Sequence, residues 1–145
     1  MISARLVRLV EDHAEELTEG LLRQLRDLPH PAGGRHVSAE EVRRRSLEVY
    51  SHLGRWLGHR SDQAIATTFS DWGRRRHADG VPASDLVVAL QTAKLNLERF
   101  VLASAGSSAV ELYQEEEFHL LVDHFFDKAI YWVVRGYEEA LSLRG

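Results

Sequence analysis

The sequence predicts an all-α fold, a single five-helix bundle, and three observations carry this prediction. Apolar residues recur every three or four positions over most of the chain, which is the repeat of a helix with one buried face. The sequence shows no strand-like alternation, low-complexity tract or internal repeat. Its 145 residues, of which 44% are hydrophobic and only three are proline, fit one domain with a sizeable core. We therefore expect residues 1–145 to form one helical domain.

The first helix is expected between Ile2 and Leu28, where the apolar residues follow a single stripe. The following PHPAGG run at residues 29–34 ends it, because proline cannot continue a helix and glycine favours turns. His13 interrupts the stripe between Val10 and Leu17. We interpret it as a partly buried, hydrogen-bonded histidine rather than as a ligand to a bound group.

The second helix is expected to begin at Ser38, because Ser38 and Glu41 have the spacing of a capping box. In that motif the serine hydroxyl accepts a hydrogen bond from the Glu41 amide, while the Glu41 carboxylate reaches back to the serine amide. The apolar stripe of this helix continues to Leu57, and residues 58–61 (GHRS) are expected to end it.

The third and fourth helices flank a tight corner at Gly80-Val81-Pro82. The third is expected from about Asp62, with Ser61 as its cap, to the corner, where Gly80 suits a left-handed C-cap. The fourth begins near Pro82, since proline is tolerated in the first turn of a helix. Its apolar side extends to Val101, and residues 105–108 (AGSS) are expected to close it.

The last helix, expected from about Val110 to Leu143, is apolar around most of its circumference. A surface helix needs only one apolar stripe, so the additional apolar side must be covered by something else. The most economical cover is a second copy of the chain. We therefore predict a homodimer, and its expected interface residues are Phe126, Ile130, Val133, Val134 and Tyr137.

The composition excludes several classes of function. Cysteine is absent, which removes disulfides, thiolate metal sites and thiol nucleophiles and favours a cytoplasmic location. The apolar runs are far shorter than the roughly 20 residues of a membrane span, and the charged N-terminus has no signal-peptide pattern. The net charge of −4 argues against binding to nucleic acid. We thus expect a soluble cytoplasmic protein that binds neither membrane nor nucleic acid.

No catalytic motif is visible, so we predict that the protein is not an enzyme. The sequence has no Gly-x-Ser-x-Gly elbow, phosphate-binding glycine loop or dinucleotide fingerprint. We interpret the charged runs as helix faces exposed to water, and acidic runs at helix starts are also favoured by the helix dipole. These runs are Glu15-Glu16, Glu40-Glu41, Glu115-Glu116-Glu117, Arg43-Arg44-Arg45 and Arg74-Arg75-Arg76.

A metal-dependent helical-bundle enzyme is one alternative. Glu116-x-x-His119, with Asp123 and His124 nearby, matches half of a carboxylate-bridged two-metal site. The second half, another Glu-x-x-His and two further glutamates, is absent from the sequence. His119 and Asp123 lie one turn apart and equally suit a hydrogen-bonded surface pair, so we predict no metal.

The aromatic residues fall on predicted inward faces, and most of them are expected in the core. A cavity among such bulky rings would admit a small apolar ligand or a tetrapyrrole. The residues expected to line this ligand pocket are Tyr50, Phe69, Trp72, Arg76, Phe100 and Phe125.

The stretch from Asp71 to Leu90 (DWGRRRHADGVPASDLVVAL) resembles the N-terminal domain of RsbRD-type RsbT co-antagonists, non-haem globin-like sensor modules of bacterial stress signalling. The helix that ends at Leu28, the capped helix at Ser38 and residues 125–137 extend the resemblance over most of the chain. It implies a non-enzymatic sensor domain that dimerises through its last two helices. Its signal would leave through the C-terminus to an output domain or a downstream signalling protein.

The same corner resembles the globin-coupled sensors, in which a proximal histidine stands four residues before the corner glycine. In this sequence Arg76 holds that position. His77 lies three residues before Gly80, about 100° around the helix from the expected direction. The resemblance therefore implies a haemless relative without a cofactor. A haem-binding gas sensor that uses His77 and a protein-interaction adaptor without a ligand remain the alternatives.

Overall fold

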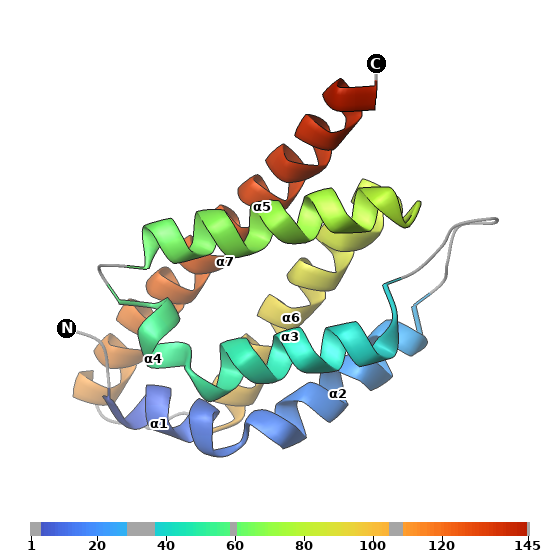
Figure 1. The fold of residues 1–145 in the computed structure, drawn as a ribbon. Helices are drawn as coiled ribbons and strands as arrows, with labels where there is room; N and C mark the ends of the chain where they lie inside the picture. Colours follow the sequence, from blue (N-terminus) through green and yellow to red (C-terminus); the bar gives the residue numbers. More distant parts are fainter. Residues whose placement is uncertain (1–3, 29–36, 59–60, 105–108, 145) are drawn as a thin grey trace.

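The computed structural model describes residues 4–28, 37–58, 61–104 and 109–144, which form seven α-helices and no strand (Figure 1). The all-α prediction is confirmed for these residues, but they form seven helices where five were expected. The loop expected at residues 29–34 and the helix end expected at residues 105–108 lie outside the described residues. The helices are α1 Ala4–Asp12, α2 Ala14–Arg26, α3 Ala39–Ser51, α4 Leu53–Trp56, α5 Asp62–Ala78, α6 Ala83–Ala103 and α7 Ala109–Arg144.

Two of the expected helices are each divided at a histidine. His13 separates α1 from α2 with φ −114° and ψ 22°, and His52 separates α3 from α4 with φ −125° and ψ 33°. The Nδ1 atom of His13 lies 2.8 Å from the carbonyl oxygen of Leu9, and that of His52 lies 3.1 Å from the carbonyl oxygen of Glu48. A side chain that binds a nearby carbonyl offers the backbone an alternative to the helical hydrogen bond. The apolar stripe continues across each bend, so its spacing alone predicts unbroken helices.

The helices form a bundle in which α6 lies between α2 and α7 (Figure 1). The antiparallel pair α2 and α3 packs on one side of α6, and α7, crossed by α5, packs on the other. The C-terminal end of α7 extends past the other helices. No helix among the described residues has the length and hydropathy required to cross a membrane.

One hydrophobic core joins side chains from all seven helices. Its centre is aromatic, with neighbouring ring centroids between 4.9 and 6.3 Å apart. Edge-on and tilted pairs predominate, as the quadrupole of aromatic rings favours. The prediction that most aromatic residues are inside is confirmed. The central rings are Trp56, Phe69, Trp72, Phe125 and Phe126.

The α5 and α7 helices cross at two glycines, Gly73 and Gly136. A Cβ atom on Gly73 would overlap the carbonyl oxygen of Val133, and one on Gly136 would overlap the carbonyl oxygen of Ser70. Both overlaps involve backbone atoms, which cannot turn aside as a flexible side chain can. The two backbones therefore touch, and this contact fixes where α7 crosses the bundle.

The predicted helix boundaries have mixed outcomes. Gly80 adopts φ 76° and the Val81 amide donates to the Arg76 carbonyl, so the left-handed cap of α5 is confirmed. The Ser38 hydroxyl accepts from the Glu41 amide at 3.1 Å, which confirms the first half of the capping box. Ser61 occupies the N-cap position of α5 as predicted, but its hydroxyl donates to the Gly58 carbonyl and makes no capping hydrogen bond to the helix.

Candidate functional site

Four of the six residues predicted to line a ligand pocket surround one inner cavity. Tyr50, Phe69, Trp72 and Phe125 lie on its wall. The Tyr50 hydroxyl donates to the Ala93 carbonyl at 2.9 Å and accepts from the Asn96 amide at 3.3 Å. Burial raises the pKa of the Tyr50 hydroxyl, and the hydrogen bond from Asn96 partly opposes this effect. The phenol therefore anchors α3 to α6 as a neutral group.

The inner cavity is too small for a ligand. Its volume is about 40 Å³, little more than the volume of one water molecule, whereas ligand pockets measure about 300–1,000 Å³. The surrounding rings fill the space that a ligand or tetrapyrrole would need. The structure thus brings four of the six predicted residues together, but an apolar ligand at this location would require the core to open.

Phe100 and Arg76 need correction, because neither lines the inner cavity. The Phe100 ring packs 5.4 Å from the ring of His13, at the bend between α1 and α2. This contact explains the partial burial that the position of His13 in the apolar stripe predicts. Arg76 turns toward the start of α3, where it meets Glu41.

Glu41 is the centre of a group of arginines. Its carboxylate, only 7% exposed, lies 2.6 Å from the Arg76 guanidinium and 3.6 Å from those of Arg44 and Arg45. Arg45 also lies 5.5 Å from the centroid of the Trp72 ring. Burial lowers the pKa of the Arg45 guanidinium, and Glu41 opposes this change. The interpretation of Glu41, Arg45 and Arg76 as fully solvated is therefore wrong, as it also is for Glu115, which is 5% exposed. The Glu41 carboxylate is not free to complete the capping box.

His77 does not face the inner cavity. Its buried ring packs edge-to-face on Tyr137 of α7 at a centroid distance of 4.9 Å. The Tyr137 hydroxyl in turn donates to the Val81 carbonyl at 2.7 Å. Ligation of haem by His77 would require the rings of His77 and Tyr137 to move apart. The same contacts hold Tyr137 against α5, although the sequence places it in a dimer interface.

Two residues of the metal alternative, His119 and Asp123, contact side chains of α6. His119 Nδ1 lies 3.4 Å from a Glu98 carboxylate oxygen, and an Asp123 oxygen lies 3.2 Å from Lys94 Nζ. The expected pair between His119 and Asp123 is replaced by these contacts with α6. Within the described part of the chain, no three histidine or acidic side chains come together in an arrangement that would hold a metal ion.

Two of the predicted dimer residues need correction, because they belong to the core. Phe126 is 2% exposed and Val133 is 0% exposed within the single chain. Ile130 and Val134 are partly buried against the same core. The reason is that α7 is covered by its own domain on two sides, by α5 and by α6. The pattern of apolar residues around a helix predicts that the helix is covered on more than one side, but it does not predict which element covers each side.

A different set of apolar residues forms what we call the outer face. Leu95 and Leu102 of α6 are 48% and 58% exposed, and Leu120 and Tyr131 of α7 are 70% and 55% exposed. All large hydrophobic residues that are exposed in the described chain lie on these two helices. The full set is Val88, Leu95, Leu102, Tyr113, Leu120, Tyr131, Leu141 and Leu143.

Two ion pairs place the apolar residues of α6 and α7 on one side. Lys94 pairs with Asp123 and Glu98 with His119, so the seam between the helices is antiparallel. Leu95 follows Lys94, and Leu120 follows His119. Successive residues are about 100° apart around a helix. In two antiparallel helices, the residues that directly follow the paired residues therefore lie on the same side of the seam. The leucines therefore belong to one continuous surface.

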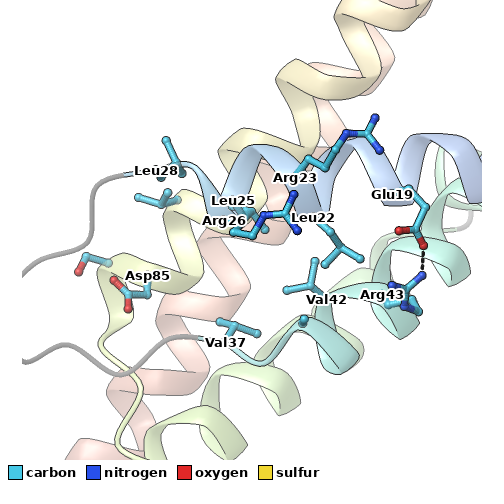
Figure 2. Close-up of a pocket in the computed structure, with 13 residues that line it drawn as sticks. Glu19, Leu22, Arg23, Leu25, Arg26, Leu28, Val37, Val42, Arg43 and Asp85 are labelled. Atoms are coloured by element: carbon cyan, nitrogen blue, oxygen red, sulfur yellow. Dashed lines mark hydrogen bonds and ion pairs between the residues drawn. The ribbon is translucent and has the colours of Figure 1, made fainter.

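A second feature, the outer pocket, lies between α2, α3 and the start of α6 (Figure 2). Its volume is about 540 Å³. Figure 2 shows Leu22 of α2 and Val42 of α3 pointing toward one another, with Arg26 of α2 beside them and the Arg23 side chain extending away from Val42. The ion pair between Arg43 and Glu19 lies at one end of the pocket.

The sequence contains a signal for the outer face but none for the outer pocket. Leu95 and Leu102 are seven residues apart, as are Tyr113 and Leu120, and such a repeat marks a helical seam. The outer pocket joins residues from three separate helices and has no such pattern. No protein-family model, curated protein or solved structure matches this chain significantly. A function can therefore be proposed only from the contacts, charges and exposed side chains of the chain itself.

Proposed function

We propose that this protein is a non-enzymatic sensory or regulatory domain that works as a homodimer through the outer face of α6 and α7. The single observation behind this proposal is that the exposed large hydrophobic side chains of the described residues all lie on these two helices. Contiguous apolar surface of this kind is typical of an interaction site. Two antiparallel helices from each chain would form a four-helix interface, the arrangement in which helix bundles bury apolar stripes.

The C-terminal end of α7 is the proposed output. It extends beyond the other helices (Figure 1), and Leu141 and Leu143 are exposed there. The glycine crossing ties α7 to α5, while the seam ties it to α6. A stimulus that favours one dimer arrangement over another would therefore move α7 as a whole. A downstream domain or signalling protein would detect that movement.

The first prediction concerns the oligomeric state. We expect light scattering to find a dimer, and a Leu95→Glu, Leu120→Glu double variant to be monomeric, because two buried carboxylates per chain would lack partners at the interface. Ala64→Glu, at an exposed position of α5, is the matched control and should remain dimeric. Circular dichroism would verify that the variants stay helical.

A wild-type protein that remains monomeric at micromolar concentration would contradict the proposal. Dimers that survive the double substitution would place the interface elsewhere. If Ala64→Glu also dissociated the dimer, the effect would reflect added charge rather than the outer face.

A further inference from the structure

The outer pocket has an apolar floor. Leu22 and Leu25 lie three residues apart on α2, Leu28 follows just beyond the end of this helix, and all three are partly exposed within the pocket. Val37, just before α3, and Val42, near the start of α3, also line the pocket (Figure 2), and Val88 completes the wall from α6. A ligand that covered this floor would remove aliphatic side chains from water, which favours an apolar body.

The rim of the pocket is cationic. Arg23 and Arg26 lie in the last turn of α2, and within the described residues neither guanidinium makes an ion pair. Arg43, by contrast, is already paired with Glu19 at the far end. Asp85, at the first turn of α6, also lines the pocket but is not free. The unpaired charge available to a ligand is therefore that of two neighbouring arginines.

From this juxtaposition we propose that the outer pocket binds a small amphipathic carboxylic acid, with its apolar body on the leucines and its carboxylate at Arg23 and Arg26. The planar guanidinium is suited to a carboxylate because it donates two parallel hydrogen bonds. A cationic amphiphile would meet like charge at the rim. A purely polar anion would leave the apolar floor uncovered. The volume of about 540 Å³ lies within the range of pockets that enclose small molecules.

The role of such a ligand rests on the proposed function, since it would be the stimulus of the sensor. The pocket wall includes α6, which also carries half of the outer face. A ligand that bound one arrangement of α6 more tightly would shift the dimer toward that arrangement. Binding itself does not depend on dimerisation, so the two proposals can fail separately.

The test compares three ligands that share one tail and differ in the head group: octanoate, 1-octanol and octyltrimethylammonium. Methyl NMR spectra would follow Leu22, Leu25 and Val42 during each titration. We expect octanoate to shift these methyl signals to saturation. Octanol should bind at least about tenfold more weakly, because it forms no charge-assisted hydrogen bond. The ammonium compound should bind most weakly.

Two variants make the assignment specific. Arg23→Gln with Arg26→Gln should weaken octanoate binding by the same roughly tenfold factor and leave octanol unchanged. Arg8→Gln, at an exposed position on α1 outside the pocket, is the matched control and should bind octanoate as the wild type does. Ser84→Trp places a large ring at an exposed position of the pocket wall and should reduce binding of both ligands.

Equal affinity for the three head groups would overturn the inference, as would the absence of saturable shifts in the pocket methyl groups. Sedimentation with phosphatidylglycerol vesicles, without an effect of octanoate, would assign the arginines to a membrane surface instead. Light scattering on the same samples separates the two proposals. A dimer that does not bind octanoate contradicts only the ligand proposal, whereas a monomer that binds octanoate contradicts only the dimer proposal.

Discussion

Arg76 and Glu41 join the end of α5 to the start of α3 through a contact of 2.6 Å. The sequence shows an arginine where a globin-coupled sensor would have its proximal histidine, and the structure gives that arginine a partner 35 residues away. Glu41 is buried enough to depend on this partner, because an unpaired buried carboxylate is costly. The pair thus stabilises the meeting point of two helices.

The adjacent arginines Arg75 and Arg76 provide a matched comparison. Arg76→Ala should lower the free energy of unfolding by about 2 kcal/mol, because it leaves the buried Glu41 carboxylate with only its two longer contacts. Arg75→Ala should cost less than about 1 kcal/mol, since Arg75 is 66% exposed and pairs with Asp71 on the surface. Urea unfolding measures both values. Equal losses for the two variants would contradict the structural role of Arg76.

The helices illustrate how single residues set the geometry of whole elements. His13 and His52 bend the chain where the apolar spacing predicts continuity. Gly73 and Gly136 allow α5 and α7 to approach until their backbones touch. Neither glycine would be noticed from periodicity, because a helical pattern tolerates a single glycine. Their importance lies in the partner helix, which is far away in sequence.

The glycine crossing can be tested by adding one methyl group. Gly73→Ala and Gly136→Ala should each lower the free energy of unfolding by about 3 kcal/mol or more, because the new Cβ would overlap backbone atoms of the other helix. Gly58→Ala is the control, since a Cβ there would meet its nearest atom at an ordinary 3.4 Å. Thermal and urea unfolding would give the comparison. Near-neutral changes at both crossing glycines would show that α5 and α7 are farther apart.

The stability of the entire bundle should respond to pH through the seam between α6 and α7. Burial raises the pKa of the Glu98 carboxyl, and the neighbouring Asp123 raises it further, while Lys94 opposes the change. A carboxyl group with a raised folded-state pKa binds its proton more tightly in the folded protein. Its contribution to stability is complete below the unfolded value of about 4.3 and is lost as pH rises through the folded value.

Glu98→Gln should therefore become more stable relative to the wild type as pH rises above about 4, because the substituted side chain no longer ionises. Urea unfolding at a series of pH values from about 4 to about 7 measures the difference. Arg99→Gln, at the exposed neighbouring position, removes no carboxyl group and serves as the control. A stability difference between Glu98→Gln and the wild type that does not vary with pH would contradict the prediction.

The sequence by itself determined the helical class, most core aromatics, the cap at Gly80 and the start of α6 near Pro82. These features depend on local spacing and on the conformational limits of single residues, which a sequence displays directly. The sequence also placed four aromatic residues on inward faces, and the structure brings them together around the inner cavity because large apolar side chains pack against one another. It did not determine the cavity's size, since packing density follows from how the side chains interlock.

Only the tertiary structure decided which apolar residues of α7 face inward. Phe126 and Val133 are covered by the chain's own helices, whereas Leu120 and Tyr131 remain outside. It also decided that Glu41 pairs with Arg76 and that three helices enclose the outer pocket. The physical reason is the same in each case. A helical repeat defines the faces of a helix, but the partner of each face depends on contacts between residues distant in sequence, which local patterns do not encode.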